Sequence, residues 1–210
     1  MNDKNFKTEQ EAFWAGEFGN DYIGRNSAPE LTAASLSLFG EILQHTRGIT
    51  SVIEFGANVG MNLRALHQLL PTADLSAVEI NSNAAEVLRA LGYADVRQES
   101  LLEYVPRDAH DLAFIKLVLI HIHPDHLPTV YDTLYASSRK YLCVCEYYNP
   151  RPVSITYRGH NDRLFKRDFA GDMLDRYPDL RLIAYGFKYR RDPVFLHDDE
   201  TWFLLEKNAS

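Results

Sequence analysis

The residues best suited to chemistry in this sequence lie at 51–63, SVIEFGANVGMNL. A β-branched run ends at Phe55, a turn follows at Gly56, and a helix is predicted to begin near Gly60. The two glycines therefore stand where a ligand can approach the backbone closely. Glu54 adds a carboxylate two residues before the first glycine. A negative charge at that position suits a ligand with an ammonium group and repels a pyrophosphate.

A second carboxylate follows on the next predicted strand. Glu79 comes 19 residues after Gly60, close to the separation of about 20 residues that ribose recognition takes in this topology. It can accept hydrogen bonds from both ribose hydroxyls. The glycine spacing is G-x-x-x-G, and not the G-x-G-x-x-G of dinucleotide-binding enzymes, which disfavours NAD. S-adenosylmethionine has both a ribose and an ammonium group, and we predict that the chain binds this cofactor.

A regular alternation of strands and helices is predicted to position these carboxylates. The order favours an α/β fold, a Rossmann-like doubly wound sheet of seven strands, mostly parallel with an antiparallel C-terminal hairpin, preceded by N-terminal helices. The apolar run 112–120, interrupted only by Lys116, is predicted to be the central strand. Predicted strands lie at 51–55, 74–80, 94–98, 112–120, 140–145, 180–187 and 201–206. Predicted helices lie at 8–18, 30–46, 60–70, 82–91, 125–137 and 168–176.

The 210 residues, 46% hydrophobic and 24% charged, are predicted to form a single domain with a large core. We divide it into an N-terminal helical lid (1–48), a cofactor-binding core (49–145), an acceptor-side insertion (146–178) and C-terminal strands (179–210). Cys143 and Cys145 share one face of a strand and are expected to be core residues. The sequence has no apolar leader and no run of membrane-spanning length, so we expect the reducing cytoplasm.

The segments IEFGANVG, AVEIN and RQESLLEY resemble the Rossmann-like S-adenosylmethionine-dependent methyltransferases, over about residues 49–145. This resemblance implies that the glycine turn lies under the methionine half of the cofactor, that the acid after the second strand binds ribose, and that the next loop frames adenine. The implied cofactor residues are Glu54, Gly56, Ala57, Gly60, Glu79, Ile80, Asn81, Ser100 and Leu101. N-terminal helices often close over the cofactor in this family, which places Tyr22, Arg25 and Asn26 in a lid.

Nearly the whole chain is similar to a narrower group, the methylases associated with pseudaminic acid biosynthesis. The similar segments are FWAGEFGNDYIGRN (13–26), KLVLIHIHPDHL (116–127), EYYNPRPVSITYRGHNDRLFKRDFAGDML (146–174) and DLRLIAYGF (179–187). The resemblance implies a methyltransferase of a nonulosonic sugar pathway. The acceptor would then be a small anionic sugar or its nucleotide-activated form.

The charge distribution bears on the acceptor. The net charge is −7, yet residues 139–191 hold 12 Lys and Arg against 6 Asp and Glu, while the rest of the chain holds 10 against 23. This basic stretch fits either an ordinary solvated surface or a cationic entrance for an anionic substrate. We predict that an anionic sugar is bound by Arg158, Arg163, Lys166 and Arg167. The overall negative charge argues against a nucleic-acid methylase, the alternative for a macromolecular substrate.

Two histidines are candidates for an acid or base that moves the acceptor's proton. His121 follows the predicted fourth strand, and His160 lies among the cations of the insertion. A competing interpretation is that residues 121–126, HIHPDH, match the H-x-H-x-D-H motif of metallo-β-lactamase-like zinc hydrolases. The motif continues into Leu-Pro rather than a small, glycine-rich turn, and only two histidines follow it. We therefore predict that the chain binds no metal. The alternative to an active-site role is that these histidines cap the following helix.

Overall fold

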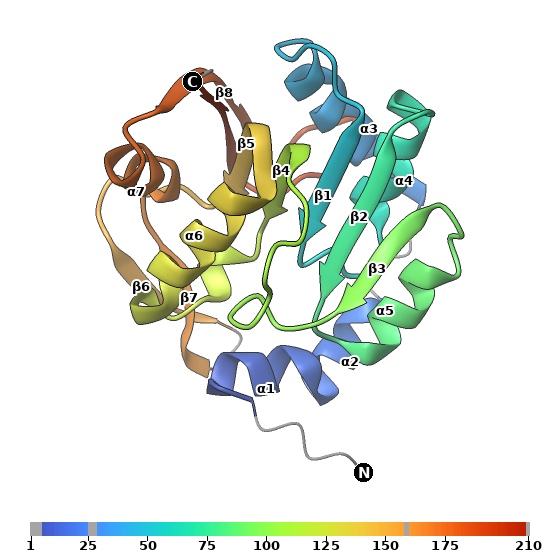
Figure 1. Cartoon of the computed structure of the whole chain (residues 1–210). Coiled ribbons are helices and arrows are strands. Elements are labelled where there is room, and N and C mark those ends of the chain that lie inside the picture. The colour runs from blue at the N-terminus through green and yellow to red at the C-terminus, as the bar shows by residue number, and fades with distance from the viewer. Residues whose placement is uncertain (1–5, 25–28, 158–159, 209–210) are drawn as a thin grey trace.

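The computed structural model describes residues 6–24, 29–157 and 160–208. Seven strands form one sheet in the order β3-β2-β1-β4-β5-β9-β8 (Figure 1). The first five strands are parallel, and β9 is antiparallel to both β5 and β8. The predicted doubly wound sheet with an antiparallel C-terminal pair is thus confirmed. The strands are β1 (Ser51–Phe55), β2 (Asp74–Glu79), β3 (Ala94–Gln98), β4 (His110–Lys116), β5 (Ser138–Glu146), β8 (Leu180–Lys188) and β9 (Glu200–Lys207).

Helices cover both faces of the sheet and create two apolar cores. Along β4, Leu112 and Phe114 point to one core, and Ala113 and Ile115 point to the other, as expected for a central strand buried on both sides. The two free cysteines are buried in the first core, as predicted. The first core packs on α3 (Pro29–Leu43), α4 (Met61–Leu69) and α5 (Ser82–Arg89), and the second on α6 (Leu127–Ser137) and α7 (Phe169–Arg176).

Two predicted elements are shorter than the sequence suggested. The helix predicted at 8–18 is two helices, α1 (Glu9–Ala15) and α2 (Glu17–Ile23), separated by the extended Gly16. The strand predicted at 112–120 ends at Lys116, because Leu117 has a positive φ of 55°. The chain then forms two 3₁₀ turns, η1 (Leu119–His121) and η2 (Pro124–His126). Leu119 and Ile120 are buried in the second core, where η1 packs against β7 (His160–Lys166), rather than in the sheet; an apolar run gives the same signal in either case.

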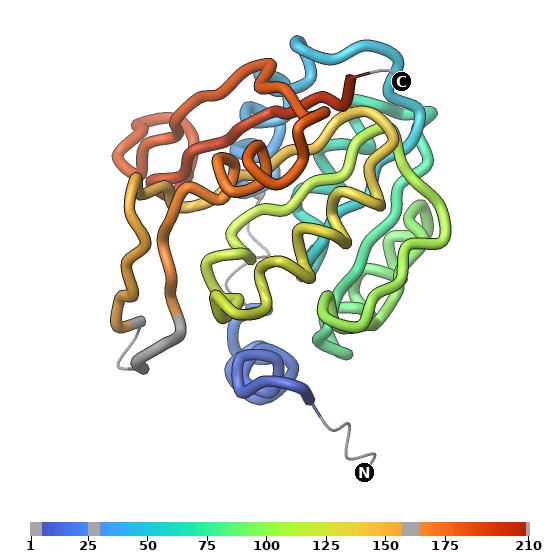
Figure 2. Tube along the Cα trace, turned by 60° about the vertical axis from the view of Figure 1, so that its left-hand side comes forward, coloured from blue at the N-terminus to red at the C-terminus, as the bar shows by residue number. Residues whose placement is uncertain are grey.

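The insertion, predicted to be irregular, contains a β-hairpin. Its strands, β6 (Val153–Tyr157) and β7 (His160–Lys166), pair antiparallel as a separate two-stranded sheet. The hairpin extends away from the main sheet (Figures 1 and 2), and β7 packs against η1. Its base is anchored by Leu164 and Phe165, which are both buried.

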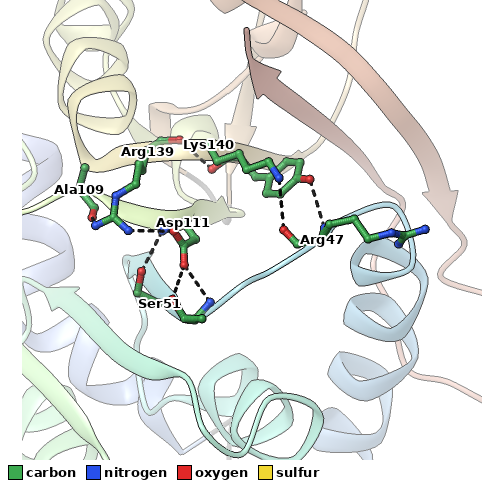
Figure 3. A network of polar contacts seen from close by, with 9 residues as sticks. Arg47, Ser51, Ala109, Asp111, Arg139 and Lys140 are labelled. Atoms are coloured by element: carbon green, nitrogen blue, oxygen red, sulfur yellow. Dashed lines mark hydrogen bonds and ion pairs between the residues drawn. The ribbon is translucent and has the colours of Figure 1, made fainter. Parts of the chain in front are cut away.

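A polar network fixes the amino ends of the central strands (Figure 3). Asp111 accepts hydrogen bonds from Thr50 N at 2.8 Å and Thr50 Oγ1 at 2.7 Å, and its own backbone N–H donates to Ser51 Oγ at 2.9 Å. Arg139 completes the network through an ion pair with Asp111 at 2.9 Å. These contacts hold β1, β4 and β5 in register at the edge opposite their carboxyl ends. No helix among the described residues is both long and apolar enough to cross a membrane.

Candidate functional site

A cavity of about 250 Å³ lies at the carboxyl edge of the sheet. The helices α1 and α2 lie across this edge (Figure 1), and residues from both of them line the cavity. In open α/β sheets this edge is where ligands bind. Nine of the predicted site residues line the cavity: Tyr22, Glu54, Gly56, Ala57, Glu79, Ile80, Ser100, Leu101 and His121.

Glu54, at the end of β1, presents a buried carboxyl group with one free oxygen. Asn62 Nδ2 donates to its Oε1 at 2.7 Å, whereas Oε2 has no hydrogen-bond partner among the described residues. Only 1% of the residue is exposed, and burial raises the pKa of Glu54 to about 8, although Asn62 and Lys116 act in the opposite direction. A buried acceptor without a partner is costly, and a cationic group in the cavity would satisfy it.

Glu79, at the end of β2, is held in place by two backbone amides. Asn58 N donates to Oε2 at 2.7 Å and Asn81 N donates to Oε1 at 2.8 Å. Burial raises the pKa of Glu79, although these hydrogen bonds oppose the shift. Because each carboxylate oxygen has two acceptor positions, each keeps one for a ligand. The carboxylate is therefore fixed in orientation and can accept two adjacent hydroxyls.

The two glycines of the turn have different roles. Gly56 lines the cavity with φ +75°, and a Cβ there would lie 2.4 Å from Val118 Cγ2. Any side chain at this position would fill the space between β1 and the segment after β4. Gly60, by contrast, caps α4 with φ +81° and does not line the cavity; a Cβ there would lie 2.6 Å from Leu88 Cδ2. Its function is to let α4 begin close to α5.

The N-terminal helices are fastened over the cavity by two of the predicted residues. Asn81 caps α5, accepting from Asn83 N and Ala84 N, and its Nδ2 donates to Trp14 O at 3.2 Å. Ser100 Oγ donates to Glu11 of α1. Asn81 thus anchors the lid and does not itself line the cavity. Tyr22 packs edge-on against Trp14 in the lid, while Arg25 and Asn26 lie outside the described residues.

His121 lies on the 3₁₀ turn after β4, facing the lid. Its ring is 4.6 Å from that of Trp14. The turn is held by Glu146 at the end of β5, whose carboxylate accepts from Val118 N at 3.0 Å and Leu119 N at 2.8 Å. Burial raises the pKa of Glu146 to about 8, against the effect of these bonds. The candidate base is therefore placed by a carboxyl group from the neighbouring strand.

A buried chain of charged groups lies at the other side of the cavity. Lys116 Nζ is 2.5 Å from Glu200 Oε2, and His197 Nδ1 is 3.3 Å from Glu200 Oε1. Lys116 and His197 both line the cavity. Burial is the largest single effect on the pKa of Glu200 and raises it, yet Lys116 and His197 together outweigh burial and leave the pKa below its usual value.

The remaining histidines of the HIHPDH motif, His123 and His126, also line the cavity, and their ring centres are 6.3 Å apart. His123 caps η2, its Nδ1 accepting from Asp125 N at 3.3 Å. Within residues 6–24, 29–157 and 160–208, no group of three or more His, Cys, Asp or Glu side chains is arranged to hold a metal ion. His123 therefore has the position of a capping residue, which was the alternative to a metal ligand.

Among the described residues, half of the twelve cations in the basic stretch are paired with acids. Six of its cations are paired with acids that mostly lie elsewhere in the chain: Arg139 with Asp111, Arg167 with Asp172, Arg176 with Asp132, Arg181 with Glu206, Lys188 with Glu41, and Arg190 with Asp199. Lys166 lies 4.8 Å from the centre of the Tyr147 ring. Lys166 and Arg167 are absent from the cavity lining. Arg158, and the side chains of His160 and Arg163, lie outside the described residues.

Several cavity residues were not singled out from the sequence. They are Trp14, Asn58, Asn62, Lys116 and His197. Asn58 has a positive φ of 47° and a buried Oδ1 without a partner among the described residues. The only sequence signal for Asn58 and Asn62 is their place within the glycine turn and the helix start after it.

No protein-family model matches the sequence, and no curated protein matches it. Similar folds occur in solved structures. The plantazolicin methyltransferase BpumL with SAH is 14% identical with a TM-score of 0.67, over 95% of this chain and 94% of that one. The fold is that of S-adenosylmethionine-dependent methyltransferases. The Burkholderia thailandensis 1,6-didemethyltoxoflavin-N1-methyltransferase is 14% identical with a TM-score of 0.69, over 95% of this chain and 87% of that one. The Synechocystis magnesium protoporphyrin IX methyltransferase is 11% identical with a TM-score of 0.68, over 94% of this chain and 97% of that one.

Proposed function

We propose that this chain is an S-adenosylmethionine-dependent methyltransferase. The observation that carries the proposal is the pair of carboxyl groups, Glu54 and Glu79, that end adjacent parallel strands and line one cavity. The solved methyltransferases of the same fold, several of which hold SAH or S-adenosylmethionine, support it.

The described residues fit this cofactor. The free oxygen of Glu54 suits the ammonium group, and the two open acceptor positions of Glu79 suit the ribose hydroxyls. Ile80, Ser100 and Leu101 line the cavity beside Glu79 and would frame the adenine. S-adenosylmethionine supplies a methyl group on a sulfonium sulfur. A nucleophile of the acceptor takes this methyl group, and the sulfur is the leaving group. The protein aligns donor and acceptor, which can contribute about 7–11 kcal/mol.

We further propose a small anionic acceptor, a nonulosonic sugar or its nucleotide-activated form. The hairpin β6–β7 is the element we assign to its recognition, through Arg158, Arg163, Lys166 and Arg167. The base of the hairpin packs next to the site: the ring of Phe165 lies 5.7 Å from that of His123, which lines the cavity. Because Arg167 is paired with Asp172, we assign the main part of anion binding to Arg158 and Arg163.

Calorimetry tests the cofactor. S-adenosylmethionine and S-adenosylhomocysteine are expected to bind, whereas NAD, with its pyrophosphate next to Glu54, is expected not to. Because Glu54 has a pKa near 8 and must ionise to hold an ammonium group, binding releases a proton below pH 8. The Kd should therefore fall as pH rises from 6 to 8, by up to about tenfold per pH unit.

The control ligand is 5′-methylthioadenosine, which keeps the nucleoside and thioether but lacks the ammonium group. Its affinity should not follow the ionisation of Glu54. Tight NAD binding, or no binding of S-adenosylmethionine at any pH, would refute the cofactor assignment.

Arg158→Ala tests the acceptor. The planar guanidinium binds a carboxylate or phosphate at two points, so its loss should lower kcat/KM for a nonulosonic acid about tenfold or more and leave the cofactor Kd unchanged. Arg181→Ala is the matched control, because Arg181 pairs with Glu206 on the main sheet, away from the hairpin. Equal activity of the two variants would place the acceptor site elsewhere.

A further inference from the structure

His197 lies on the loop between β8 and β9, and its side chain is only 3% exposed. The loop reaches the carboxyl edge because β9 runs antiparallel to β5, and His197 and the preceding Leu196 both line the cavity. The His197 Nε2 is buried and has no hydrogen-bond partner among the described residues. A buried nitrogen without a partner, on a residue that lines a ligand cavity, points to a group that the ligand brings.

The other ring nitrogen of His197 faces a carboxylate. Nδ1 is 3.3 Å from Glu200 Oε1, which is within ion-pair distance, although Oε1 makes no hydrogen bond to a described residue; Glu200 is fully buried. The other oxygen of Glu200 pairs with Lys116, which keeps the carboxylate ionised. In a neutral imidazole only one nitrogen carries a proton. A carboxylate beside Nδ1 favours the proton there, and Nε2 is then the nitrogen with the free lone pair.

We infer that His197 is the general base of the reaction, that Glu200 is its positioning residue, and that the acceptor group is a hydroxyl. This inference rests on the proposed function. The acceptor oxygen forms its bond to the methyl carbon as the carbon–sulfur bond breaks, with that electron pair going to sulfur, and the hydroxyl proton goes to Nε2 of His197. The resulting imidazolium is stabilised by Glu200.

The arrangement distinguishes His197 from His121. Both line the cavity, but the His121 ring lies 4.6 Å from that of Trp14, whereas His197 has the Glu200 carboxylate 3.3 Å from its Nδ1. The charged groups around His197 are Glu200, with Lys116 beyond it, and Asp192, which accepts from Val194 N and Phe195 N in the same loop. Of these groups, Glu200 is the one within ion-pair distance of Nδ1.

The first experiment needs no acceptor. Nitrogen–proton correlation spectra of the imidazoles, recorded with and without S-adenosylhomocysteine and assigned with His197→Gln, report which ring nitrogen is protonated. In the neutral imidazole of His197, we expect the proton on Nδ1 in both samples. A proton on Nε2 would overturn the inference, whether or not the cofactor binds.

The second experiment measures methyl transfer to a nonulosonic acid against pH. His197→Gln should lower kcat about 100-fold or more and remove the acid limb of the profile, while the cofactor Kd by calorimetry stays unchanged. Added imidazole should restore part of the activity of His197→Ala. His67→Gln is the control, because His67 stacks on Tyr93 at 4.0 Å outside the cavity.

The two proposals fail in different ways. If the parent protein binds no S-adenosylmethionine, the proposed function fails, whereas the spectra still report the state of His197. If the parent is active and His197→Gln keeps its activity and its acid limb, the inference fails and the function stands. Loss of the acid limb in His121→Gln instead of His197→Gln would assign the base to His121.

Discussion

Glu79→Ala is expected to weaken S-adenosylmethionine binding about 10- to 100-fold. Glu79 is a fixed carboxylate, and its charge-assisted contact to ribose would be lost with it. A hydrogen bond to a charged group contributes about 1.5–3 kcal/mol, which corresponds to this change in Kd. Calorimetry measures the effect directly and requires no knowledge of the acceptor.

The control for this prediction is Glu99→Ala. Glu99 follows β3 at the same edge of the sheet, and its backbone N–H donates to Glu79 O at 3.1 Å, but its side chain does not line the cavity. Removing this charge should leave the Kd unchanged within about twofold. Because Glu79 also binds two backbone amides, Glu79→Gln is measured in parallel, and thermal melting verifies that each variant is folded. Unchanged affinity in a folded Glu79→Ala protein would remove Glu79 from the site.

The cavity residues at the ends of β1 and β2 could be predicted from the sequence because they belong to local patterns. Glu54 and Glu79 each end a buried strand, and the carboxyl ends of parallel strands meet at one edge. The same patterns gave the order of the helices and strands. The role of Asn81 was different from the one implied, since capping of α5 and anchoring of the lid depend on the position of Trp14, which a local pattern does not contain.

The other side of the site depends on contacts between distant residues. Lys116 and Glu200 are 84 residues apart in the sequence. They come together only because β4 and β9 lie on either side of β5. Counting charges along the sequence is limited for the same reason. The basic stretch looks unbalanced along the sequence, yet Lys188 pairs with Glu41, 147 residues away. Counting charges along a chain cannot show such pairs.

Glu200→Ala is expected to be the most destabilising of the substitutions considered. Glu200 is fully buried, and its removal would leave Lys116, whose side chain is only 17% exposed, without its partner. Burial is the largest single effect on the pKa of Lys116 and lowers it, but Glu200, with smaller contributions from Cys145 and Asp198, outweighs burial and holds the pKa above its usual value. Removing one partner of a buried ion pair lowers the free energy of unfolding by about 3–5 kcal/mol. For a chain of this size, that lowers Tm by roughly 10 °C.

Glu206→Ala is the matched control, because it removes the same group from the same strand. Its partner Arg181 is 61% exposed, and an exposed pair contributes only about 0–1 kcal/mol. The double variant Lys116→Met with Glu200→Leu should recover much of the lost stability, since replacing both members of a buried pair by apolar residues is often neutral. It should not recover activity, because Glu200 would then no longer hold His197. Equal melting temperatures for Glu200→Ala and Glu206→Ala would mean that water reaches Lys116 and that the pair does not depend on burial.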